Sequence, residues 1–129
     1  MIGLDTNVLV RYFTRDDEAQ WQQAGGIINH ADSCFISNVV LCELVWVLSG
    51  KSYQYSLTEI LDTLELILQS DKFEFTNRTV IYQAIKLTRL GKADFADYLI
   101  GAVNHNYQCS KTVTFDQKLT GEKWYQVLN

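Results

Sequence analysis

Five carboxylate side chains stand at positions where they could hold a metal ion. Asp5 and Asp116 each follow a short apolar segment directly, and Asp94 and Asp97 open a helical pattern. Glu43 lies inside a strongly apolar stretch. Carboxylates that converge in a fold repel one another, by roughly 4 kcal/mol for a pair about 4 Å apart at an effective dielectric near 20. A divalent cation removes this cost, and an all-oxygen ligand set suits Mg²⁺ or Mn²⁺ rather than zinc.

The chemistry that such a site predicts is hydrolysis of a phosphodiester bond. A carboxylate-held cation activates a water molecule as a nucleophile and stabilises the charge that develops on phosphate. This mechanism needs neither a catalytic histidine nor a substrate 2′-hydroxyl group. It therefore agrees with a sequence in which His30 and His105 are the only histidines and have no evident catalytic partner.

Most of these acids also have a purely structural interpretation. Asp94 and Asp116 could be helix N-caps, a frequent position for Asp. Asp97 could be an acid of the first helical turn that complements the helix dipole. Asp5 could also be a cap, although Thr6 would serve equally well.

Glu43 is the acid that is hardest to explain by structure alone. Its helical neighbours at three and four residues are apolar, and no Lys or Arg occurs from position 16 to position 50. A local salt bridge is therefore excluded, and burying an unpaired charge is costly. The structural alternatives are that Glu43 reaches solvent at an edge or meets a distant Arg.

Strands and helices are expected to alternate along the chain. The apolar runs predict strands at 1–4, 34–36, 73–75, 112–115 and 124–128, the first of them buried. Helices are expected from Thr6, over 38–48 and 78–90, behind the capping-box pair Ser56 and Glu59, and from Asp94. A further helix should follow the acids at 16–18 and carry Trp21, Ala24, Ile27 and Ile28. This order predicts a single α/β domain over residues 1–129, with a central parallel sheet of four to five strands and helices on both faces. Ligands bind beyond the carboxyl ends of such strands, where Asp5, Asp116 and the start of the Asp94 helix should lie together.

Composition limits the class of protein. The 129 residues are 47% hydrophobic, enough for one domain with its own core. The net charge of −4 is unusual for a passive nucleic-acid-binding module, but two bound divalent cations would cancel it. The three cysteines, without a Cys-x-x-Cys pair, indicate neither a zinc site nor a disulfide framework. With no signal peptide or membrane span evident, a cytoplasmic protein is expected.

The motifs resemble those of PIN-domain ribonucleases, and most closely the VapC toxins of bacterial toxin–antitoxin pairs. The matching segments are Met-Ile-Gly-Leu-Asp5-Thr6-Asn7, Ser37 to Glu43, Asp94-Phe-Ala-Asp97-Tyr-Leu-Ile-Gly-Ala and Thr114-Phe-Asp116. Each motif is short, but their order and spacing cover essentially the whole chain.

The resemblance implies an Mg²⁺- or Mn²⁺-dependent endoribonuclease that leaves 5′-phosphate and 3′-hydroxyl ends. It assigns the central acids to Asp5, Glu43 and Asp97, and a second, weaker metal position to Asp116. Asp5 and Asp97 would be the direct ligands, with Asp94 a helix cap or an outer group. Three further residues would shape the site: Thr6, Asn7 and Thr114.

The resemblance also implies partners. VapC-like toxins form homodimers and are inhibited by a VapB antitoxin, whose C-terminal segment covers the active site, often with an Arg. Their substrates are structured RNAs, such as a tRNA anticodon loop or a ribosomal RNA loop. In this sequence Arg11 and Arg15 lie one helical turn apart near Asp5 and could contact phosphate, or they could be solvated surface charges.

Other functions agree less well with the residues. A receiver domain would have paired acids after the first strand and an Asp after the third, where this chain has Thr76-Asn77. A haloacid-dehalogenase-type phosphatase would have Asp rather than Asn7 two residues after Asp5. A flap nuclease would have an additional helical arch. A catalytically inactive PIN domain that only binds remains a further alternative.

Overall fold

Helix caps fix where most of the helices begin in the computed structural model, which describes residues 1–129. The first N–H groups of a helix have no partner within it, and a side-chain oxygen just before the helix can accept from them. Asp17, Ser37 and Asn77 do so at 3.0, 3.3 and 3.1 Å. Ser56 and Glu59 form the expected capping box, with Glu59 N donating to Ser56 Oγ at 3.1 Å and Ser56 N donating to Glu59 Oε1 at 2.9 Å. The predicted starts of these helices are confirmed.

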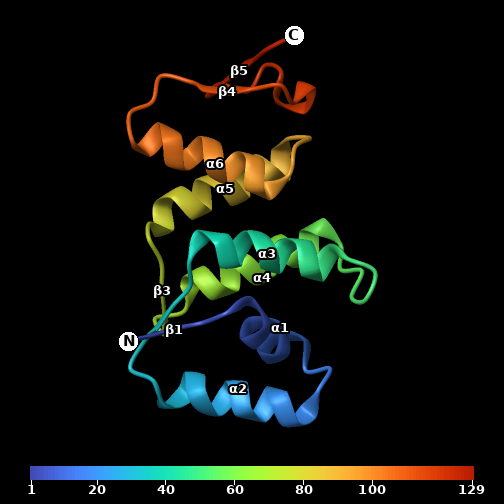
Figure 1. Cartoon of the computed structure of the whole chain (residues 1–129), viewed down its shortest axis with the longest axis vertical. Coiled ribbons are helices and arrows are strands. Elements are labelled where there is room, and N and C mark those ends of the chain that lie inside the picture. Colours follow the sequence, from blue (N-terminus) through green and yellow to red (C-terminus); the bar gives the residue numbers. More distant parts are fainter. The chain divides into compact units, whose positions relative to one another are not determined.

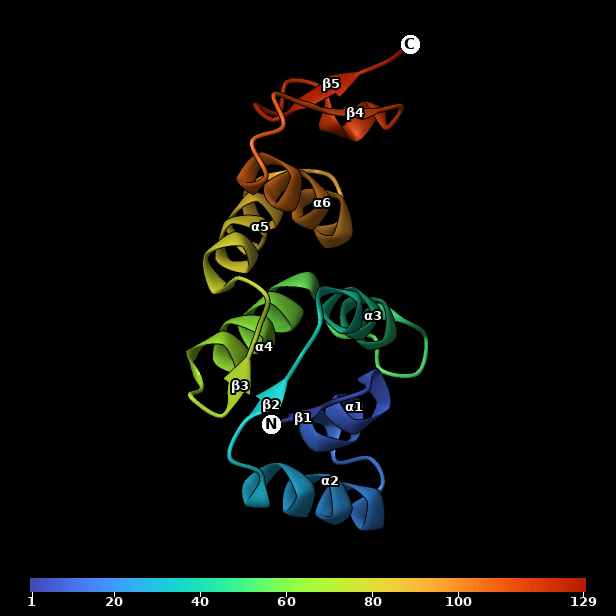
Figure 2. The same ribbon diagram turned by 60° about the vertical axis from the view of Figure 1, so that its left-hand side comes forward.

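The chain divides into two compact units, and each is described by itself. The N-terminal unit (Met1–Thr76) contains β1 (Ile2–Gly3), α1 (Thr6–Thr14), α2 (Glu18–His30), β2 (Cys34–Phe35), α3 (Asn38–Ser49), α4 (Leu57–Gln69) and β3 (Phe73–Glu74). Its strands form one parallel sheet in the order β1-β2-β3. They lie between α2 and the pair formed by α3 and α4 (Figure 1 and Figure 2). In this unit, helices on both sides of a parallel sheet are confirmed.

The C-terminal unit (Asn77–Asn129) consists of α5 (Arg78–Leu90), α6 (Phe95–Asn106), β4 (Thr112–Thr114), the short 3-10 helix η1 (Gln117–Leu119) and β5 (Tyr125–Val127). The two helices pack along one another, and β4 contacts α6. β4 and β5 pair in parallel, with Thr112 opposite Tyr125 and Thr114 opposite Val127. The carboxyl ends of both strands therefore face the same way.

Each unit has its own buried apolar side chains. In the N-terminal unit they come mainly from one face of each helix and include Leu9, Ile28, Leu41, Leu44, Leu48, Ile60, Leu64 and Ile67. In the C-terminal unit they include Ile81, Ala84, Phe95, Tyr98 and Ala102. The helical spacing of apolar residues after Ser56 was the clearest periodic signal in the sequence, and it corresponds to the buried face of α4.

Two expectations about the strands are wrong. A single sheet of four to five strands was expected, but the structure has a three-stranded sheet and a separate two-stranded one. The alternation of strands and helices predicts parallel pairing correctly, but it contains no information on which short strands share hydrogen bonds. The segment 1–4 was expected to be buried, whereas only Leu4 is, and Ile2 is 39% exposed. β1 is an edge strand of its sheet, which leaves one side of it uncovered.

None of the helices is both long and apolar enough to cross a membrane. All three cysteines are free: Cys34 is buried, Cys42 is half-buried and Cys109 is exposed.

Candidate metal centre

The N-terminal unit brings two of the expected acids to either side of one threonine. Asp5 is the N-cap of α1, and its Oδ1 accepts a hydrogen bond from Thr6 N at 2.8 Å. The Thr6 side chain is buried, and its hydroxyl donates to Glu43 Oε1 in the middle of α3 at 2.9 Å. Thr6 therefore links Asp5 to Glu43, which lies 37 residues after Thr6 in the sequence. Contact between α1 and α3 makes this link possible.

Glu43 is not buried on an apolar face of this unit. It is exposed, and its helical neighbours Val39 and Trp46 are 68% and 58% exposed. The carboxylate has solvent and the Thr6 hydroxyl as partners, and no Arg reaches it. Of the alternatives open for Glu43, solvent access is the one seen in the N-terminal unit. The Glu43 carboxylate therefore lies on an exposed surface between two apolar side chains, Val39 and Trp46.

The C-terminal unit brings together the other three acids. Asp94 is the N-cap of α6, and its backbone N donates to Asp97 Oδ2 at 3.3 Å. Asp116 follows β4 and caps η1, where its Oδ1 accepts from Lys118 N at 2.9 Å. The Thr114 hydroxyl accepts from Asp116 N at 3.0 Å, so Thr114 fixes the turn that carries this acid.

The charges of these acids act on one another. Partial burial raises the pKa of the Asp97 carboxyl, and the neighbouring charges of Asp116 and Asp94 raise it further. The hydrogen bond from the Asp94 backbone and the Lys118 ammonium oppose this rise. Asp97 is thus a partly desolvated carboxylate with two like charges nearby, and a divalent cation would relieve this repulsion. Neither unit by itself contains a group of three acids arranged to hold a metal ion.

The structure therefore divides the four principal acids into two pairs, Asp5 with Glu43 and Asp97 with Asp116. A family model described as PIN domain matches residues 2–121 and so spans both pairs. The chain belongs to the PIN domain family. No curated protein matches it.

Membership in the PIN domain family suggests a role for these acids. PIN domains are generally metal-dependent nucleases, and they usually bind divalent metals and act on nucleic acid. The donor chemistry of this PIN domain fits such a metal, because all the side chains concerned offer oxygen atoms, the ligands that hard cations prefer. The receiver and phosphatase alternatives are excluded, since the match covers nearly the whole chain.

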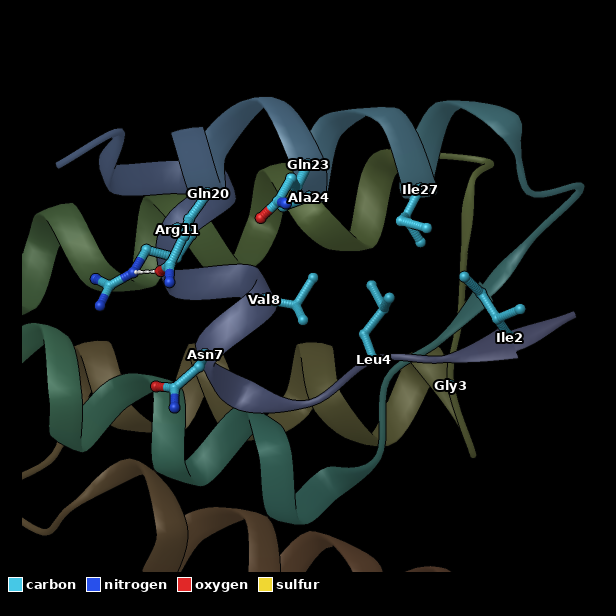
Figure 3. A pocket seen from close by; sticks show the side chains of 10 residues that line it. All are labelled: Ile2, Gly3, Leu4, Asn7, Val8, Arg11, Gln20, Gln23, Ala24 and Ile27. Atoms are coloured by element: carbon cyan, nitrogen blue, oxygen red, sulfur yellow. Dashed lines mark hydrogen bonds between the residues drawn. The ribbon is translucent and has the colours of Figure 1, made fainter. Parts of the chain in front are cut away.

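A hollow of about 370 Å³ in the N-terminal unit is separate from the acids. It lies between β1, α1 and α2, and Asn7 is at its rim (Figure 3). Its walls are mostly apolar and include Leu4, Val8, Ala24 and Ile27. Neither Asp5 nor Glu43 lines it, so this hollow is not the place where carboxylates gather.

Arg11 and Arg15 both lie more than one helical turn along α1 from Asp5. They stand at the C-terminal end of α1, and a rise of 1.5 Å per residue puts Arg15 roughly 15 Å along the axis from Asp5. Arg11 forms a salt bridge with Asp16 at 3.0 Å, and Arg15 lies 3.7 Å from the centroid of the Trp21 ring. Both guanidinium groups therefore have partners in the N-terminal unit.

Tyr125 is a supporting residue that was not predicted from the sequence. Its hydroxyl, in β5, donates to the backbone carbonyl of Asp97 at 2.5 Å. Gly101, one turn further along α6, makes room for the ring, because a Cβ atom there would lie 2.0 Å from the Tyr125 hydroxyl. A glycine inside a helical pattern is a signal for such close packing. Since β5 pairs with β4, Tyr125 connects the helix of Asp97 to the strand that precedes Asp116.

Replacing Asp97 with Asn is expected to raise the melting temperature of the metal-free protein at neutral pH. Folding raises the pKa of the Asp97 carboxyl above its ordinary value of 3.8, so the folded protein binds this proton more tightly than the unfolded chain does. The resulting stability is complete below pH 3.8 and is lost as the pH rises through the raised pKa. Asn has the same shape and can still accept from Asp94 N, but it has no charge. The gain should shrink as the pH falls, and thermal unfolding in EDTA at a series of pH values measures it. The matched control is the exposed Asp71→Asn, which should show no such gain; a fall for Asp97→Asn at neutral pH would contradict the prediction.

Proposed function

We propose that this PIN domain is an Mg²⁺- or Mn²⁺-dependent endoribonuclease that leaves 5′-phosphate ends. Asp5 and Asp97 are the direct metal ligands in this proposal, and Glu43 and Asp116 complete the site. The observation that carries it is the pairing of these four acids, one pair in each unit, within a family match that spans both. Asp5 and Asp116 also follow β1 and β4, as expected for acids at the carboxyl ends of parallel strands.

Cations held by these acids would supply a nucleophilic water and would neutralise charge on the phosphate. The chain's own residues prepare the acids for this task. The Thr6 hydroxyl orients one oxygen of Glu43, and the Thr6 backbone holds one oxygen of Asp5. Thr114 fixes the turn of Asp116, and Lys118 places a positive charge near Asp97, where it can also approach a substrate phosphate. In this proposal Asp94 is the cap of α6 and Asn7 shapes the edge of the site.

Neither histidine has a catalytic role in this proposal. His30 Nδ1 lies 2.8 Å from the carbonyl oxygen of Gly26, within α2. His105 stacks on Trp124 near the C-terminal end of α6, eight residues beyond Asp97. Both imidazole rings therefore have structural partners, and the proposed mechanism assigns the role of base to neither of them.

The resemblance to VapC toxins extends the proposal. The domain would act as the toxin of a toxin–antitoxin pair, as a homodimer, with a tRNA or ribosomal RNA loop as substrate. A basic segment of a VapB-like antitoxin would cover the site, and the acids would attract its Arg. A short reading frame for a DNA-binding protein directly upstream of the gene would support this extension.

Cleavage that depends strictly on a divalent metal tests the nuclease proposal. Purified protein is incubated with total RNA, and with RNA and DNA oligonucleotides of the same sequence, in Mg²⁺, in Mn²⁺ and in EDTA. We expect RNA to be cut in either metal and left intact in EDTA. The product ends should ligate to an adaptor only where they carry a 5′-phosphate. Cutting that persists in EDTA would contradict the metal mechanism, and no cutting in any metal would favour the inactive binding module.

A further inference from the structure

The charge of the chain is divided unevenly between the two units. The N-terminal unit has four Lys and Arg against eleven Asp and Glu, a net charge of −7. The C-terminal unit has seven against four, a net charge of +3. Three of its four acids are those of the candidate metal centre, and the fourth, Glu122, accepts a hydrogen bond from the Tyr98 hydroxyl. Apart from the acids of the candidate site, this unit therefore has one acid against seven Lys and Arg, which favours a polyanionic partner.

Lys123 and His105 lie against the ring of Trp124, and Lys111 is bound to the backbone next to it. The Lys123 ammonium lies 4.8 Å from the centroid of the Trp124 ring, and the His105 ring stacks on Trp124 with centroids 4.4 Å apart and 15° between the planes. Lys111 Nζ donates to the backbone carbonyl of Lys123 at 2.9 Å. Lys111, Lys123 and His105 are exposed, and Trp124 is half-buried. We call these four residues the Trp124 cluster.

The backbone holds the Trp124 cluster in place. Thr112 N, at the start of β4, donates to the carbonyl of Trp124 at 2.8 Å. Asn104, one residue before His105 in α6, donates from its side-chain amide to the Thr112 hydroxyl at 3.0 Å. Helix α6 and both strands therefore fix the position of the cluster.

The Trp124 cluster and Asp116 lie at opposite ends of β4. The cluster adjoins Thr112, and Asp116 follows the carboxyl end of the strand. At about 3.3 Å per residue in an extended chain, four residues separate them by roughly 13 Å. Both lie in the C-terminal unit, so an extended strand of nucleic acid that passes Asp97 and Asp116 can reach the cluster within a few nucleotides.

We propose that the Trp124 cluster binds the single-stranded RNA that flanks the bond to be cut. Lys111 and Lys123 would contact phosphates, and the flexible stem of Lys123 lets its ammonium turn from the indole to a phosphate and leave a ring face for a base. Lysines beside an aromatic ring are typical of surfaces that bind single strands without reading their sequence. The inference rests on the proposed nuclease function, because that function supplies RNA as the partner.

Binding measured without cleavage tests the cluster. A short fluorescein-labelled oligouridine is titrated with protein in EDTA, and anisotropy is followed at several salt concentrations. For single strands, each phosphate that the protein neutralises adds about 0.7 to the magnitude of the slope of log K against log salt, so Lys111→Gln with Lys123→Gln should reduce that magnitude by about 1.4. Trp124→Leu should weaken binding by roughly fivefold to a hundredfold, the effect of removing one stacked base. The double lysine variant replaces two exposed side chains and keeps the indole, so it serves if Trp124→Leu fails to fold.

Lys86→Gln with Lys51→Gln is the matched control, because it removes the same charge from exposed lysines of α5 and of the N-terminal unit. This control should change the slope by less than half as much. The inference is overturned if the Lys111 and Lys123 variant matches the wild type or the control, or if wild-type protein does not bind the oligouridine. It is also overturned if the variant changes only the oligomeric state in sedimentation, which would indicate an acidic protein surface as partner. If the variant changes the salt slope as expected but the wild type does not cleave RNA, only the nuclease proposal is contradicted. If the wild type cleaves RNA but the variant keeps the wild-type slope, only the present inference is contradicted.

Discussion

Asp97→Asn is expected to reduce metal-dependent RNA cleavage by about a thousandfold or more. A bound cation contributes several kcal/mol of charge stabilisation in the transition state, and about 1.4 kcal/mol corresponds to a factor of ten in rate. Asn keeps the shape of the side chain and its hydrogen bond from Asp94 N, but not the negative charge that attracts the metal. Single-turnover cleavage of labelled RNA in Mg²⁺ measures the loss. Asp5→Asn should have an effect of similar size.

The controls for this prediction separate loss of the site from loss of the fold. Asp97→Asn should unfold at a higher temperature than the wild type in EDTA, so an inactive but more stable protein is the expected signature. Asp94→Asn keeps a good N-cap residue on α6 and should retain most of its activity if Asp94 is only a cap. If cleavage survives in both Asp97→Asn and Asp5→Asn, these residues are not the metal ligands.

Local signals in the sequence predict most of the elements correctly. The caps at Ser37, Ser56 and Asn77 act within three residues, so a short stretch of sequence contains all the information they need. Gly91 ends α5 as expected. Strand positions also follow from short apolar runs. The membership of the sheets was wrong because the pairing of strands only two or three residues long depends on contacts between distant segments.

The candidate site shows the same division between local and distant information. The acids could be selected from their types and positions, and Asp94 does occupy a cap. The partner of Glu43 could not be predicted, because Thr6 lies 37 residues away and reaches it only through the packing of α1 on α3. The bond from Tyr125 to the Asp97 carbonyl spans 28 residues and likewise depends on how β5 packs on α6.

Gly101→Ala is expected to destabilise the protein by about 2 kcal/mol, although alanine is the better helix former. A Cβ atom at this position would lie 2.0 Å from the Tyr125 hydroxyl and 2.3 Å from its Cζ atom, closer than real contacts allow. The ring must move, and its hydrogen bond to the Asp97 carbonyl, worth about 1 kcal/mol, is broken as it does so. Urea unfolding followed by circular dichroism measures the change in free energy.

Gly26→Ala is the matched control, because it makes the same substitution inside α2, where no atom lies within 4 Å of the added Cβ. It should stabilise the protein by about 0.5–1 kcal/mol, the usual gain when alanine replaces glycine in a helix. In a Tyr125→Leu background the ring is absent, so Gly101→Ala should lose most of its cost. If Gly101→Ala proves as stabilising as Gly26→Ala in the wild-type background, Tyr125 does not pack against α6, and the support that it gives to Asp97 fails with it.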